Sequence, residues 1–74
     1  MAKQTFGLRL QAWRTAHGLT QEQLAKKCDW HPSLISHYEN GTRLPGIKNL
    51  EDLCKATNTS PAYFMGFAEA MVPP

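Results

Sequence analysis

The side chains best suited to metal binding or nucleophilic chemistry are three histidines and two cysteines: His17, His31, His37, Cys28 and Cys54. The histidines lack the spacing of three or four residues that places two ligands on one face of a helix, and no carboxylate cluster accompanies them. The cysteines form no Cys-x-x-Cys pair, which argues against a zinc knuckle and a disulfide scaffold. We therefore predict no metal and no cofactor, and we expect both cysteines to be reduced thiols in the core.

Catalytic signatures are also missing from the sequence. It contains no glycine-rich phosphate loop, no nucleophile elbow and no pair of acidic residues at catalytic spacing. A chain of 74 residues buries only about 60% of its unfolded surface, which leaves little room for a substrate cavity. We predict that the protein is not an enzyme.

Four polar residues recur at helical spacing near the middle of the chain: Ser33, Ser36, His37 and Asn40. They share one face of a helix, while Ile35 and Tyr38 fall on another. Serine and histidine side chains can donate to, or accept from, the edges of DNA bases. If Ile35 and Tyr38 face the core, the polar face is free to enter a major groove. The predicted base-contacting residues are Ser33, Ser36 and His37.

The net charge and the hydropathy of the sequence indicate which partners and which cellular location are possible. A net charge of +2 permits DNA binding but does not by itself indicate it. No apolar run approaches the roughly 20 residues of a membrane span, and the N-terminus lacks the apolar core of a signal peptide. We expect a soluble, cytoplasmic protein associated with the nucleoid of a bacterial or phage-infected cell.

Apolar residues at helical spacing predict an all-α fold, a compact bundle of five short helices. The predicted helices span residues 5–17, 21–28, 32–40 and 47–58, with a short last helix from residue 61. Strand-like alternation and internal repeats are missing. We expect one domain over residues 1–66 and a C-terminal tail over residues 67–74.

Cap and turn residues mark the ends of these helices. Gly18 stands where a left-handed cap would end the first helix, and Thr20 with Gln23 forms a capping-box pattern at the start of the second. Pro32 and Pro61 occupy first helical positions, where proline is favoured. The second and third helices are thus joined by a tight turn, which is the arrangement of a helix-turn-helix unit.

Three stretches of the sequence resemble a known family. They are residues 18–25 (GLTQEQLA), residues 35–41 (ISHYENG), and Pro45 followed by residues 50–56 (LEDLCKA). Together they resemble the phage repressor and Cro-type helix-turn-helix regulators, or xenobiotic response element family, over about residues 6–66. The sequence departs from that family at Asp29, where glycine is usual, and at Trp30, where a small aliphatic residue is usual. It also departs at His37, where arginine or glutamine is frequent.

The resemblance implies a lambda repressor-like DNA-binding domain and assigns roles to individual residues. Arg14 and Glu39 match positions that form an ion pair between the first helix and the end of the third. The residues expected to contact DNA phosphates are Gln21, Asn40, Thr42 and Arg43. Lys26 and Arg9 are further electrostatic candidates.

We therefore predict a transcriptional regulator that binds a near-palindromic double-stranded DNA operator. Of the two signs of regulation, we predict repression. Because one short helix reads few base pairs, a homodimer would bind half-sites about 34 Å apart. We assign the dimer contact to an apolar C-terminal group: Phe64, Phe67, Met71 and Val72. Two alternatives stay open. One is an antitoxin-type module that binds a protein partner, and the other is the DNA-binding portion of a longer phage repressor, with Pro73 and Pro74 opening a linker.

Overall fold

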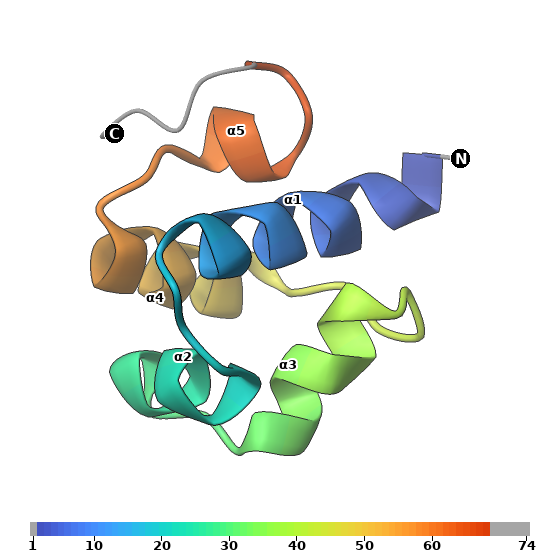
Figure 1. The fold of residues 1–74 in the computed structure, drawn as a ribbon. Helices are drawn as coiled ribbons and strands as arrows, with labels where there is room; N and C mark the ends of the chain where they lie inside the picture. The colour runs from blue at the N-terminus through green and yellow to red at the C-terminus, as the bar shows by residue number, and fades with distance from the viewer. Residues whose placement is uncertain (1, 69–74) are drawn as a thin grey trace.

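The computed structural model describes residues 2–68, and within this range the chain forms five α-helices and no strand. The helices are α1 (Ala2–Ala16), α2 (Gln21–Cys28), α3 (Pro32–Glu39), α4 (Ile47–Thr57) and α5 (Pro61–Phe64). α2 and α3 pack together on one side of α1, and α5 packs on the other (Figure 1). The all-helical fold is therefore confirmed. In this part of the chain, no helix has the length and apolar composition needed to cross a membrane.

The first helix differs most from its predicted bounds. It begins at Ala2 rather than at residue 5, because residues 2–4 are good helix formers and contain no breaker. It ends at Ala16, after which Gly18 adopts the predicted left-handed conformation with φ 67°. The N–H of Leu19 then donates to the carbonyl of Arg14 at 3.0 Å, as in a Schellman motif. This turn directs the chain from α1 into α2.

The turn between α2 and α3 forms despite the unusual residue at its centre. α2 has its predicted bounds, and both hydrogen bonds of the capping box join Thr20 and Gln23. At the other end, Asp29 adopts the left-handed conformation, with φ 60° and ψ 42°. The N–H of Trp30 donates to the carbonyl of the fully buried Ala25 at 2.8 Å. Aspartate therefore takes the role that glycine has in the family, at the cost of some backbone strain.

The core collects the apolar side chains of all five helices. Its buried members are Phe6, Leu10, Trp13, Leu24, Ala25, Cys28, Ile35, Tyr38, Leu53, Cys54, Tyr63 and Phe64. Leu19, Trp30 and Leu50 are partly buried and pack against this group. Ile47 lies on the apolar side of α4 by helical spacing, yet it exposes 81% of its surface because the first residue of α4 projects beyond the core.

The predicted dimer contact needs a correction at Phe64. This side chain is fully buried in the core and cannot meet a second protomer. The prediction was wrong because a domain this small has few large side chains with which to fill its core and therefore buries Phe64. Phe67 exposes 85% of its surface. Met71 and Val72 lie outside the described residues.

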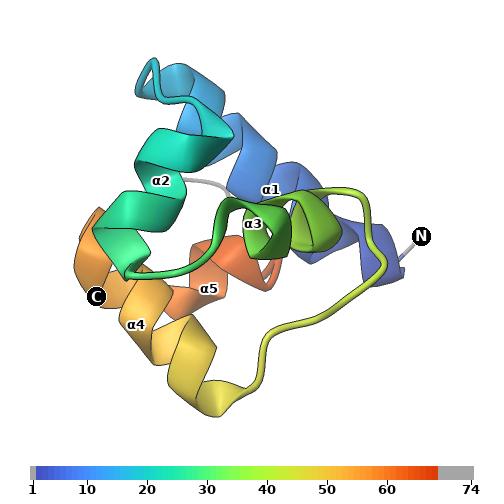
Figure 2. The ribbon, with the colours of Figure 1, turned by 90° about the horizontal axis from the view of Figure 1, so that it is seen from below.

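α1 supports the end of α3 through a close approach at Gly7. A Cβ atom added at Gly7 would lie 2.5 Å from the carbonyl oxygen of Tyr38 and 2.7 Å from that of Glu39. Beside it, the rings of Phe6 and Tyr38 pack edge to face with centroids 5.4 Å apart. Seen from below, α2 and α3 form the nearest layer of the molecule (Figure 2). The absence of a side chain at Gly7 thus allows α3 to rest directly on α1.

Candidate nucleic-acid interface

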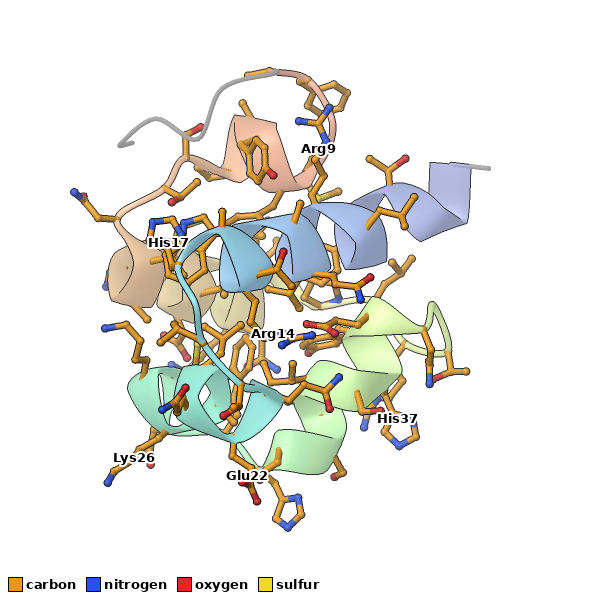
Figure 3. All side chains as sticks on the ribbon, viewed as in Figure 1. Arg9, Arg14, His17, Glu22, Lys26 and His37 are labelled. Atoms are coloured by element: carbon orange, nitrogen blue, oxygen red, sulfur yellow. The ribbon has the colours of Figure 1, made fainter. Side chains whose placement is uncertain are left out.

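α3 presents a polar face because its apolar side chains are anchored in the core. Ile35 is fully buried and Tyr38 is 2% exposed, as predicted. The Tyr38 hydroxyl accepts a hydrogen bond from Nδ2 of Asn49 at 2.9 Å, which connects α3 to α4. The three predicted base-contacting residues are exposed or half-buried on the same helix: Ser33, Ser36 and His37. The His37 side chain points away from the ribbon (Figure 3).

One carboxylate connects the ends of three helices. Glu39, the last residue of α3, accepts hydrogen bonds from Nε and Nη2 of Arg14 at 2.6 and 3.0 Å. It also accepts one from Nε2 of Gln21, the first residue of α2, at 3.0 Å. The Arg14 and Glu39 side chains are only 14% and 7% exposed, and the hydrogen bond to Glu39 raises the pKa of Arg14. The expected ion pair therefore forms, and Arg14 holds α1 against α3.

The engagement of Gln21 is a contact that the sequence did not reveal. The side-chain amide of Gln21 was expected to contact a DNA phosphate, but it donates to Glu39, which is 18 positions away in the sequence. No local sequence pattern connects these two residues. The first N–H groups of α2 have no partner within the helix and point out of its N-terminus. A phosphate contact by Gln21 stays a prediction, and its backbone N–H is the group best suited to make it.

The loop after α3 folds back onto His37. Nδ1 of His37 lies 2.9 Å from Oγ1 of Thr42. Thr42 in turn donates to Oδ1 of Asn40 from its N–H at 3.1 Å and from its hydroxyl at 2.7 Å. Gly41, with φ 82°, provides the left-handed turn that brings these side chains together. The structure thus brings His37, predicted to contact a base, together with Asn40 and Thr42, predicted to contact phosphates. This contact depends on the conformation of the loop and could not be predicted from a sequence pattern.

The start of α3 is capped by a histidine. Nδ1 of His31 accepts the N–H of Ser33 at 3.2 Å and lies 2.9 Å from the Ser33 hydroxyl. The sequence predicted a helix start here from Pro32, but histidine is not among the usual capping residues and gave no such signal. The cap fixes the first turn of α3 and occupies one side of the Ser33 hydroxyl.

Cationic side chains lie on both sides of the molecule. Arg43 and Lys26 are exposed. Arg9 lies on the other side, next to α5 (Figure 3). Its Nη1 donates to the carbonyl of Ala68 at 2.8 Å, and its guanidinium stacks 4.8 Å from the centroid of the Tyr63 ring. Arg9 is thus placed away from the face that carries His37.

The cysteines and histidines form no cluster of chemical interest in residues 2–68. No group of three or more histidine, cysteine, aspartate or glutamate side chains there could hold a metal ion. Cys28 and Cys54 are buried free thiols, as predicted. Burial raises the pKa of both, that of Cys28 to about 11 with a smaller contribution from Asp52. Both thiols are therefore protonated core residues at neutral pH.

Comparison with known proteins gives a family match and two similar sequences. Residues 10–64 match the helix-turn-helix family. Control protein C.BamHI of Bacillus amyloliquefaciens is 39% identical over 49 residues, which are 66% of this chain and 60% of that protein. This match therefore spans less than two thirds of the relative. An uncharacterized HTH-type transcriptional regulator of Bacillus subtilis (strain 168), YazB, is 31% identical over 74 residues, covering 100% of this chain and 97% of that protein.

Two solved structures share the fold closely. The restriction-modification controller protein C.AhdI from Aeromonas hydrophila matches with a TM-score of 0.78 and 34% identity, covering 84% of this chain and 94% of that one. The clp gene regulator ClgR from C. glutamicum matches with a TM-score of 0.79 and 25% identity, covering 93% and 90%. Family members of this kind are DNA-binding regulators rather than enzymes. This chain belongs to the helix-turn-helix family of DNA-binding transcriptional regulators.

Proposed function

We propose that this protein binds a specific double-stranded DNA operator with α3 in the major groove. The observation that carries the proposal is the fixation of α3. Ile35 and Tyr38 are buried, and the carboxylate of Glu39 holds the end of the helix. A recognition helix held on one side can present the other side to base edges in a single orientation. The side chains proposed to contact bases are Ser33, Ser36 and His37.

Phosphate contacts would come from the two ends of this face. Gln21 lies at the N-terminus of α2, where the helix dipole and free N–H groups favour an anion. Asn40 and Arg43 lie in the loop after α3, and the Arg43 side chain is exposed. Thr42, also predicted there, already donates its N–H and its hydroxyl within the loop, so we assign it the role of holding Asn40 rather than a direct phosphate contact. Contacts on both sides of α3 would set its depth and register in the groove. The protein would act at the nucleoid, without catalysis or a cofactor.

A homodimer on a near-palindromic operator suits the small size of this interface. One helix of eight residues contacts few base pairs, so useful specificity requires a second copy on the next turn of DNA, about 34 Å away. The exposed Phe67, in the proposed tail at residues 67–74, is the apolar side chain we assign to the contact between protomers. Deleting residues 67–74 should then yield a monomer in analytical ultracentrifugation, whereas an unchanged sedimentation coefficient would place the dimer contact elsewhere.

Similarity to two controller proteins suggests which genes are regulated. One of them, C.AhdI, is a restriction-modification controller protein. We propose that the operator of this protein lies upstream of its own gene or of neighbouring restriction-modification genes, where binding represses transcription. A reporter fused to that upstream region tests the sign of regulation, because repression predicts higher reporter expression when the protein is removed.

Selection from random DNA duplexes is the direct test of operator binding. We expect a two-fold symmetric consensus, bound at least ~10³ times more tightly than scrambled DNA. Ser36→Ala and His37→Ala should weaken binding to the consensus. Lys48→Ala should not, because Lys48 is exposed on α4, where it pairs with Asp52 of the same helix. Weak, salt-sensitive binding without a consensus would refute the proposal and favour the antitoxin-type alternative, in which a protein partner is the main ligand.

A further inference from the structure

The hydrogen bonds of Thr42 limit what its hydroxyl group can do. Its backbone N–H is shared between the carbonyl oxygen of His37 at 3.0 Å and Oδ1 of Asn40 at 3.1 Å, which fits Oδ1 as the amide oxygen. The Thr42 hydroxyl lies 2.7 Å from the same oxygen and 3.2 Å from the backbone carbonyl oxygen of His37. Neither oxygen carries a hydrogen, so the single hydroxyl proton must point to one of them. Toward any other group, the hydroxyl can only accept.

This arrangement favours one tautomer of the neutral His37 ring. Nδ1 of His37 faces the Thr42 hydroxyl oxygen at 2.9 Å and must therefore donate to it. A neutral imidazole carries one proton, so Nε2 is left with an unshared electron pair. Nε2 lies on the edge of the ring away from Thr42, and the His37 side chain is exposed and directed away from the helix (Figure 3). The group that reaches outward is thus a hydrogen-bond acceptor.

We infer that His37 reads an exocyclic amino group, N6 of adenine or N4 of cytosine, at one position of each half-site. The inference rests on the proposed function, which places α3 in the major groove. Only adenine and cytosine present a donor on their major-groove edge, whereas guanine and thymine present acceptors there. A neutral His37 held in this tautomer has no proton to offer guanine. Thr42, which does not touch the base itself, is then a positioning residue for specificity.

The other two histidines provide internal references for the ring tautomer. Nδ1 of His31 accepts the N–H of Ser33, so the neutral ring must carry its proton on Nε2. Nδ1 of His17 lies 2.8 Å from the carbonyl oxygen of Trp13, so that ring must carry its proton on Nδ1. The structure therefore assigns one tautomer to His17 and His37 and the opposite one to His31.

Long-range ¹H–¹⁵N correlation NMR on the full chain, at a pH where the imidazoles are neutral, tests this assignment without DNA. We expect His37 to match His17 and to differ from His31. Thr42→Val should release His37 toward the Nε2-protonated form, while Thr42→Ser should retain the wild-type pattern. A wild-type His37 protonated on Nε2, or a spectrum that Thr42→Val leaves unchanged, would overturn the inference.

Selection from random duplexes with the same variants tests base reading. His37→Ala identifies the position that His37 reads, because base preference is lost there. At that position the wild-type protein should prefer adenine or cytosine over guanine by about 3- to 10-fold, the effect of one hydrogen bond. Thr42→Val should abolish this preference or shift it to guanine, and Thr42→Ser should keep it.

The two experiments separate failure of the inference from failure of the proposed function. Guanine preferred at the His37 position by the wild-type protein would refute amino-group reading while leaving operator binding intact. The absence of any consensus would refute the proposed function, and base reading by His37 would fall with it. In that case the NMR result alone would still decide the tautomer.

Discussion

Replacing Gly7 by alanine should destabilise the protein, although alanine is the better helix former. The new methyl group would lie 2.5 Å from the carbonyl oxygen of Tyr38, about 0.9 Å short of the 3.4 Å at which ordinary contacts begin. The carbonyl oxygen of Glu39 is nearly as close, at 2.7 Å. Both obstacles are backbone atoms of α3, so rotation of a side chain cannot relieve them. α1 and α3 would have to move apart.

The expected size of the effect follows from two opposing contributions. Forcing an extra methyl group into a packed interior costs about 1–3 kcal/mol. Alanine returns about 1 kcal/mol through its higher helix propensity. The free energy of unfolding should therefore fall by roughly 1 kcal/mol, which lowers Tm by about 4–8 °C in a domain of this size. Because α3 carries His37, its displacement should also weaken binding to the selected operator.

Thermal unfolding followed by circular dichroism measures this change. Gly46→Ser is the matched control because Gly46 has φ −76° and nothing within 4 Å of an added Cβ. Serine there can also accept a hydrogen bond from the first turn of α4, so its Tm should equal or slightly exceed that of the wild type. A Gly7→Ala protein with wild-type Tm and wild-type operator affinity would refute the close approach of α1 and α3.

Three further predictions concern charge and protonation. Glu39→Ala should lower the free energy of unfolding by about 2–3 kcal/mol in urea titrations, because it leaves the mostly buried Arg14 side chain unpaired. Removing the exposed Lys48 should change the free energy of unfolding by less than about 0.5 kcal/mol. Burial raises the pKa of Cys28 to about 11 from an ordinary value of 9.0, so the unfolded state loses this proton first. Stability should therefore be unaffected by Cys28 below about pH 9 and fall as pH rises toward 11, and Cys28→Ala should lessen that alkaline loss. Arg43→Ala should weaken binding to all DNA sequences alike and reduce the slope of log K against log salt by about 1, and a loss confined to the consensus would contradict a phosphate contact.

The helices were predictable because the residue types close to each helix end determine where the helix begins and ends. Gly18 ends α1 in the left-handed conformation, and Thr20 and Gln23 form the capping box of α2. Ile35 and Tyr38 fall on the buried side of α3 by spacing alone. Each of these features depends on residues within four positions of one another, which is the range over which sequence patterns are informative.

The errors arose where position in the fold overrides local pattern. Ile47 fits the apolar stripe of α4, but it stands at the tip of the helix and remains exposed. Phe64 was predicted at the dimer contact, yet a chain this short requires it in the core. Two side-chain hydrogen bonds, Gln21 to Glu39 and His37 to Thr42, were also not predicted. They depend on the path of the loops between these residues, and helical spacing gives no information about that path.

The junction at Glu39 implies that the DNA-binding surface is assembled before DNA arrives. Arg14 from α1 and Gln21 from α2 meet on the same carboxylate at the end of α3, so the orientation of the two motif helices is fixed in the free protein. Association then requires no coupled folding, and its heat-capacity change should correspond to the interface area alone. Substitutions at this junction should alter affinity for every DNA sequence together, whereas substitutions on the outer face of α3 should alter which sequence is preferred. Under the proposed function, rigidity and specificity are therefore carried by different residues and can change independently.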